Sequence, residues 1–190
     1  CARSLFELFM LLPFVEHGLF GFQIPRGAPR PDPLLAYKIL GGLSMEAGEH
    51  LPNNRKHIEV LRHLGITLEL DQQTHEDDGT VSMAGTSWQA SKVLADYITN
   101  PLNGIEWRDS SVIELGSGIG TCSLAAAIMG ARVVATDASS TSLSLIRANA
   151  ERNTDNFRHP ALVAPLLWGD QETMEPFKNV AFDIIMALSL

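Results

Sequence analysis

The sequence predicts an α/β domain built on a parallel sheet, and two observations lead to this prediction. From residue 111 onward, short apolar runs alternate with amphipathic stretches of helical period, the pattern of strand–helix–strand units. A glycine-rich turn, Glu114–Gly120, separates the first run from the first helix. The apolar runs are nearly continuous, as expected of strands that are buried on both faces. We therefore place the core at residues 111–190.

Strands and helices are expected to alternate in this core. The strands are Ser111–Leu115, Arg132–Thr136, Ala161–Leu167 and Phe182–Leu188, and the helices are Ile119–Met129 and Ser140–Arg152. Gly130 ends the first helix, because glycine readily adopts the left-handed conformation that follows a last turn. Either Ser139 or Ser140 caps the second, because a serine hydroxyl accepts from free N–H groups of the first turn.

Residues 55–110 form the second predicted region, a hairpin and a helix that precede the core. Ile58, Leu61 and Leu64 can share one face of a short helix, and Gly65 stands where that helix would end. The next residues, Ile66–Leu70, alternate apolar and polar side chains as a half-buried strand does.

A longer amphipathic helix is predicted over Ser87–Ile98. Thr86 and Gln89 have the spacing of a capping box, and Asn100–Pro101 stops the helix. The acidic segment Glu76–Gly79 lacks the distributed ligands of a calcium loop, so we expect a solvated turn there.

Residues 1–54 form an irregular extension in which we expect one or two short helices between prolines. The apolar run Phe9–Val15 is interrupted by Pro13 and is much shorter than the roughly 20 residues that cross a bilayer. Its resemblance to a signal-peptide core is weak, because Glu7 interrupts it and no clear cleavage site follows. We therefore expect no membrane association.

Composition narrows the function classes. The net charge is -8 and 45% of residues are hydrophobic, which indicates a globular chain and disfavours a nucleic-acid partner, since phosphate binding relies on Lys and Arg. Cys1 and Cys122 form no disulfide framework or zinc spacing. We expect a reducing compartment, the cytoplasm, with the nucleus as a second location.

The glycine-rich turn is the motif that carries chemistry. Glycines bring backbone N–H groups against a ligand, and the positive end of the following helix attracts a carboxylate. Asp137 ends the second predicted strand, where a carboxylate can accept from both hydroxyls of a ribose. A glycine turn without a ligand would leave this placement of Asp137 to coincidence. Turn, helix, strand and acid together predict one nucleotide-like binding site.

A dinucleotide-binding site has the same architecture, and glycine spacing separates the two possibilities. Its fingerprint has a third glycine three positions after the second, which here is Thr121. In this chain the glycines fall at alternate positions, and Glu114 stands two positions before the first. This arrangement favours an S-adenosylmethionine-dependent methyltransferase.

The stretch from about Ile66 to Ala187 resembles the seven-strand, non-SET protein-lysine methyltransferases, known as methyltransferase family 16. The matching motifs run from the segment before the long helix to the fourth strand: Gly85-Thr86-Ser87-Trp88, Val112-Ile113-Glu114-Leu115-Gly116-Ser117-Gly118, Ala135-Thr136-Asp137, Asn149 and Asn153, Leu167-Trp168-Gly169 and Phe182-Asp183-Ile184-Ile185-Met186-Ala187.

This resemblance implies a Rossmann-like class I methyltransferase sheet, here with about four core strands, S-adenosylmethionine as cofactor and a protein lysine as methyl acceptor. In the family, the equivalents of Trp88, Trp168 and Ala187 lie beside the cofactor. The expected cofactor-binding residues are Trp88, Glu114, Gly116, Ser117, Gly118, Gly120, Asp137, Ala138, Trp168 and Ala187. No residue is assigned a catalytic role, and no metal is expected.

The chain departs from the family pattern at its end. The family follows strand four with Ala-Ser-Asp, whereas here Ser189 stands at the acidic position. The sheet order of the family is 3-2-1-4-5-7-6, of which this sequence supplies the first four places, so we expect a C-terminally truncated form. Strand four would then be an exposed apolar edge that could support self-association.

Three functions remain open. The first is methylation of a protein lysine, and the second is methylation of another acceptor, such as histidine, arginine or a small molecule. The third is an inactive, truncated module that acts through protein contacts.

Overall fold

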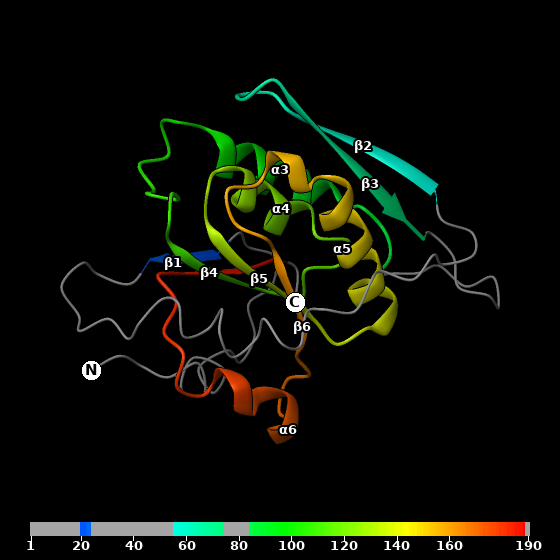
Figure 1. The fold of residues 1–190 in the computed structure, drawn as a ribbon, viewed down its shortest axis with the longest axis vertical. Coiled ribbons are helices and arrows are strands. Elements are labelled where there is room, and N and C mark those ends of the chain that lie inside the picture. The colour runs from blue at the N-terminus through cyan, green and yellow to red at the C-terminus, as the bar shows by residue number, and fades with distance from the viewer. Residues whose placement is uncertain (1–19, 24–54, 74–83, 189–190) are drawn as a thin grey trace.

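The computed structural model describes residues 20–23, 55–73 and 84–188, the first of these as backbone only (Figure 1). The helices expected within residues 1–54, the apolar run Phe9–Val15, the acidic turn Glu76–Gly79 and the departure at Ser189 lie outside the described residues.

A parallel sheet forms the centre of the fold. Its strands β4, β5, β6 and β7 lie in the spatial order β7-β4-β5-β6, so β4 is flanked by parallel neighbours on both sides. This confirms the predicted order of the first four strands. Their bounds are Ser111–Leu115, Arg132–Asp137, Leu162–Pro165 and Ile184–Ala187.

The expectation of an exposed edge at the fourth core strand is wrong for this structure. Strand β1, Phe20–Gln23, pairs antiparallel with β7 in the register Phe20↔Ala187. The backbone groups on that side of β7 are therefore occupied from within the chain, which removes the basis for self-association through this edge. Strand β1 was not predicted, because four residues beside a proline-rich stretch give little strand signal.

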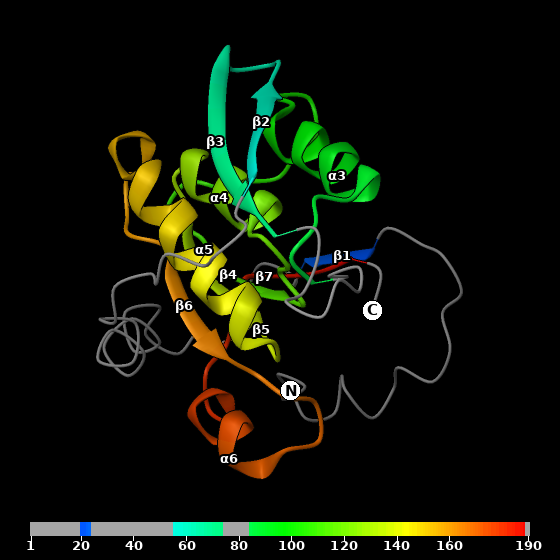
Figure 2. The same cartoon turned by 90° about the vertical axis from the view of Figure 1, so that its right-hand side faces the viewer.

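Helices cover the two faces of the sheet unequally (Figures 1 and 2). Helices α4, Thr121–Ile128, and α5, Ser140–Arg152, lie on one face, and the short α6, Gln171–Met174, lies on the other. The Ser139 hydroxyl accepts from the N–H of Ser142 at 3.3 Å, so Ser139 is the cap of α5. Short 3-10 turns, Thr154–Asn156 and Glu175–Phe177, follow α5 and α6.

The helix expected around Ile58 is a strand. β2, Arg55–Leu61, pairs antiparallel with β3, Ile66–Gln72, and Gly65 lies in the turn between them with φ +63°. The helical spacing of three apolar residues hid an equally clear alternation, in which Leu61 is buried and Ile58 is exposed. The strand predicted over Ile66–Leu70 is confirmed.

Helix α3, Gln89–Thr99, follows the hairpin, but the expected capping box is wrong. Trp88 holds the N-cap position, with no side-chain cap hydrogen bond. The segment before it is tied to the end of β3 instead: Gln73 N–H donates to Gly85 O at 2.9 Å, and Ser87 N–H donates to Gln72 Oε1 at 3.1 Å. These bonds hold residues 84–88, the described part of the connector before α3, to the end of β3.

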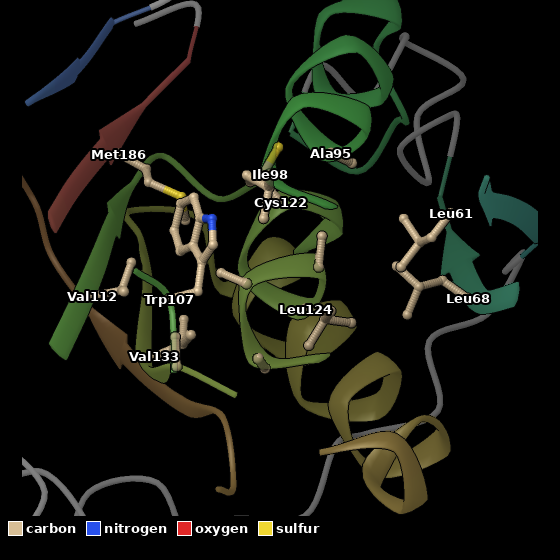
Figure 3. Packing of buried hydrophobic residues seen from close by; sticks show 14 of the residues in the cluster. Leu61, Leu68, Ala95, Ile98, Trp107, Val112, Cys122, Leu124, Val133 and Met186 are labelled. Atoms are coloured by element: carbon tan, nitrogen blue, oxygen red, sulfur yellow. The ribbon is translucent and has the colours of Figure 1, made fainter. Parts of the chain in front are cut away.

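One apolar cluster joins the hairpin, the helices and the sheet (Figure 3). Leu61 and Leu68 reach inward from the hairpin, and Leu124 of α4 lies between them and the sheet residues Val112 and Val133. The opposite face of the sheet has a second cluster, which includes Phe177 and Phe182. The hairpin is therefore an outer layer over the helices.

Candidate cofactor-binding site

Most of the predicted site residues lie at the carboxyl end of the parallel sheet. Leu115, the last residue of β4, is in register with Thr136 of β5 and with Ala187 of β7. Asp137 is in register with Pro165 at the end of β6. The glycine turn, Asp137 with Ala138, and Ala187 therefore follow or end adjacent strands at one edge, where ligands bind in open α/β sheets.

Gly118 and Gly120 of the glycine turn have a positive φ, which favours glycine, and at Gly120 a side chain would also be crowded. Gly120 is the N-cap of α4 with φ +89°, and a Cβ there would lie 3.3 Å from Cγ2 of the buried Ile146. A Cβ on Gly118, with φ +56°, would lie 3.4 Å from the carbonyl oxygen of Ala84. The turn is thus closely covered by α5 and by the connector before α3. Gly116 is exposed at its beginning.

Asp137 is held against the glycine turn by two backbone donors. Gly118 N–H donates to Oδ2 and Ser139 N–H donates to Oδ1, both at 2.9 Å. An ionised carboxylate has about four lone-pair sites, so each oxygen can still accept from a further donor. The carboxylate is 9% exposed and fixed in direction, as a binding group for a vicinal diol should be.

Ser117 joins the turn to β5 through its backbone N–H and its hydroxyl group. Its N–H donates to Thr136 O at 2.9 Å, and its hydroxyl oxygen accepts from Thr136 N–H at 3.1 Å. The same hydroxyl donates to Glu114 O, in β4, at 3.4 Å. Ser117 is buried and fixes the turn from below.

Glu114 is buried beneath the turn. Ser123 of α4 donates its hydroxyl to Glu114 Oε2, and Thr136 donates its hydroxyl to Glu114 O at 2.6 Å. Burial raises the pKa of the Glu114 carboxyl from 4.5 to about 7, and hydrogen bonds from Ser123 and Ser117 oppose part of this rise. Glu114 therefore supports the glycine turn from beneath, and its side chain is hydrogen-bonded to α4.

The two predicted tryptophans are partly open to solvent. Trp88 at the start of α3 and Trp168 after β6 are each 44% exposed. Ala138 is exposed directly after Asp137, and Ala187 is half-buried at the end of β7. Two accessible aromatic side chains are suitable for stacking on a flat base.

Sequence reasoning missed the support that α5 gives to the turn. The side-chain amide of Asn149 donates to Ile119 O at 2.9 Å, inside the glycine turn. Ser142 donates its hydroxyl to Ala84 O at 3.2 Å, on the connector that covers Gly118. The available signal was a polar side chain on the core-facing side of an amphipathic helix, because buried polar groups usually have specific partners.

The donor set fits a ligand that combines a carboxylate with a sugar. The first-turn N–H groups of α4 follow the turn, where an anion is favoured by the helix dipole, and α4 itself is apolar and buried. The Asp137 carboxylate retains acceptor capacity for hydroxyl groups, as described above. These are the groups that the amino-acid tail and the ribose of S-adenosylmethionine require.

Comparison with known proteins agrees with the interpretation of this site as one for S-adenosylmethionine. Residues 68–189 match the profile of methyltransferase family 16, described as lysine methyltransferase. The chain is 33% identical over 115 residues to mouse protein N-lysine methyltransferase METTL21A, covering 60% of this chain and 50% of that protein. It is 33% identical over 102 residues to mouse protein-lysine methyltransferase METTL21E, covering 53% and 41%. The chain thus spans about half the length of the curated relatives it matches.

A solved structure with a similar arrangement is the 16S rRNA N2 G1207 methyltransferase RsmC of T. thermophilus, in complex with AdoMet and guanosine. It shares 19% sequence identity, covers 80% of this chain and 42% of its own, and has a TM-score of 0.44. Within the described part of this chain, no helix has both the length and the apolar character needed to cross a bilayer.

Proposed function

We propose that this chain, which belongs to the lysine methyltransferase family, transfers a methyl group from S-adenosylmethionine to the side-chain amine of a lysine in a protein. The observation that carries the proposal is the pairing of Asp137 with the glycine turn. Both carboxylate oxygens are fixed by backbone N–H groups, one of them in the turn itself.

The proposed site residues divide by the part of the cofactor that they would hold. Gly116, Gly118, Gly120 and the first turn of α4 would surround the amino-acid tail, while Asp137 and Ala138 would hold the ribose. Trp88, Trp168 and Ala187 would border the base and the sulfonium side. Glu114 and Ser117 would act from beneath, by fixing the turn.

When bound, S-adenosylmethionine supplies an electrophilic methyl group on a sulfonium. The protein has to hold the acceptor nitrogen in line with that methyl group and exclude water. A lysine amine must also be neutral to attack, which burial favours by lowering its pKa. Ser189 stands where the family has an acid beside the acceptor, so we assign no catalytic residue.

The proposed organisation has three parts: an extension over 1–54, a hairpin and helix over 55–110, and the cofactor-binding core over 111–190. The proposed partner is a protein substrate, with no nucleic acid. The proposed location is the cytoplasm, with the nucleus as a second site. The relatives named above as lysine methyltransferases support the substrate class.

Isothermal titration calorimetry with S-adenosylmethionine tests cofactor binding. We expect the wild-type chain to bind, and Asp137→Ala to weaken binding at least about tenfold, since a hydrogen bond to a charged group contributes roughly 1.5–3 kcal/mol. Asp155→Ala, which changes an exposed aspartate of a 3-10 turn, is the control and should bind as the wild type does. Equal affinity of Asp137→Ala and the wild type would remove the basis of the proposal.

Transfer is tested separately with methyl-labelled S-adenosylmethionine and protein extract, followed by peptide mass spectrometry. Label on lysine supports the proposed acceptor, and label on histidine, arginine or a small molecule assigns another one. Binding without any transfer favours an inactive module, for which the substitution at Ser189 is the supporting observation.

A further inference from the structure

Asn149 of α5 and Asn153, the C-cap of α5, close one edge of the hairpin. Asn149 accepts from Asp71 N–H at 2.6 Å and donates to Asp71 O at 3.0 Å. Asn153 accepts from Glu69 N–H at 3.1 Å and donates to Glu69 O at 2.8 Å. Each carboxamide thus pairs with one residue of β3 as a neighbouring strand would.

The helix and the strand have matching repeats, which allows this double pairing. Residues four apart on a helix are separated by about 6 Å along its axis. Alternate residues of a strand are separated by about 6.6 Å, and they direct their backbone groups to the same side. Asn149 and Asn153 are 0% and 3% exposed; the pairing with Asp71 is buried, and the pairing with Glu69 is partly buried. These pairings by themselves assign both asparagines the same role, the attachment of the hairpin to α5.

The third hydrogen bond distinguishes the two asparagines. Asn153 donates to Asn149 O at 2.7 Å, within its own helix. Asn149 donates instead to Ile119 O at 2.9 Å, in the glycine turn. One amide group therefore fixes α5, β3 and the turn to each other.

The hydrogen bond from Asn149 to Ile119 O fixes the orientation of the Ile119–Gly120 peptide, which the glycine itself does not restrict. Gly120 follows Ile119 and has φ +89°, a region in which glycine has little steric preference between neighbouring conformations. The Ile119–Gly120 peptide is held at both ends: its carbonyl accepts from Asn149, and its N–H donates to Ser117 O at 2.8 Å. The peptide cannot rotate without breaking both bonds, so the N–H groups on either side keep their directions.

We propose that Asn149 is a positioning residue for cofactor binding, which orients the glycine turn through Ile119 without touching the cofactor. The proposal rests on the function proposed above, in which this turn surrounds the amino-acid tail of S-adenosylmethionine. A turn that is already in its binding conformation loses less conformational freedom when the ligand arrives. Asn149 therefore contributes to affinity, whereas Asn153 contributes only to the attachment of the hairpin.

The test compares Asn149→Ala and Asn149→Asp with Asn153→Ala in the full chain. Asn153→Ala is a matched control, because it also removes a pair of bonds to one β3 residue and one further bond. Asn149→Asp keeps the shape and the acceptor for Asp71 N–H, but it can donate neither to Asp71 O nor to Ile119 O. The measurements are calorimetry with S-adenosylmethionine, amide hydrogen exchange of the turn in the cofactor-free protein, and urea unfolding.

We expect both Asn149 variants to bind S-adenosylmethionine roughly three- to tenfold more weakly, the range for one lost hydrogen bond, and Asn153→Ala to stay within about twofold of wild type. Exchange at residues 118–121 should rise in the Asn149 variants only. Equal weakening by Asn153→Ala, or unchanged affinity in a folded Asn149 variant, overturns the inference. If the wild type itself does not bind, the proposed function fails, and unchanged exchange in the Asn149 variants then overturns the positioning role independently.

Discussion

Replacing Glu114 with glutamine should change how the stability of the protein depends on pH. Glu114 is 2% exposed, and burial raises the pKa of its carboxyl group to about 7 from an ordinary value of 4.5. The folded state therefore binds a proton more tightly than the unfolded state. The stability from this group is fully present below pH 4.5 and is lost as the pH rises to about 7.

The magnitude follows from the number of pH units between the lower test pH and the folded pKa. One pKa unit corresponds to about 1.4 kcal/mol, so the change from about pH 5.5 to about pH 8 is on the order of 2 kcal/mol for a folded pKa near 7. Glutamine has the shape of the protonated acid and does not titrate. Glu114→Gln should thus gain about 2 kcal/mol relative to the wild type over the same interval.

Urea unfolding of both proteins at the two pH values measures this difference. All other titrating groups are shared and largely cancel in the comparison. Glu175→Gln, which changes an exposed carboxylate paired with Lys178, is the control and should show much less change. If the difference between Glu114→Gln and the wild type is the same at both pH values, the carboxyl does not titrate in this range, and the account of its burial is wrong.

Two further substitutions test the backbone and the far end of the sheet. Gly120→Ala should lose about 1 kcal/mol more stability than Gly104→Ala in thermal unfolding. Both glycines have a positive φ, but only Gly120 is close to Ile146, whose side chain is stiff and buried. Equal losses would contradict this reasoning. Hydrogen bonds from His159 and Arg158 lower the pKa of Asp109 to about 2 from 3.8. The stability that these contacts give is present above pH 3.8 and is lost as the pH falls through about 2. The loss of thermal stability in Asp109→Asn, relative to the wild type, should therefore be smaller at about pH 3 than at about pH 5. A loss that is equal at both pH values would argue against these contacts.

The sequence predicted the parts of the fold that have strong local patterns. The continuous apolar runs located the parallel strands, and the pair Ser139 and Ser140 located the start of α5, for which the structure shows Ser139 as the cap. The hairpin strand around Ile58 was missed because a short apolar series fitted two periods equally well. Strand β1 was missed because its formation depends on pairing with β7, which local sequence does not encode.

The same distinction holds for the candidate site. Glycine spacing and Asp137 predicted residues that the structure brings together at one edge of the sheet, because each depends on local backbone geometry. The support by Asn149 could not be predicted from spacing alone, since it depends on how β3 packs against α5. The burial of Glu114 likewise depends on the position of Ser123 in the first turn of α4.

The pairing of β1 with β7 has a consequence for the order of folding. These strands stand near opposite ends of the described chain, whereas β4, β5 and β6 are joined by short helical connections. During synthesis the three inner strands can assemble while β7 is still within the ribosome. Strand β1 has to wait for its partner, and closing so long a loop carries an entropic cost that local strand pairs avoid. We therefore expect this side of the sheet to form last, after the glycine turn and Asp137 are already in place.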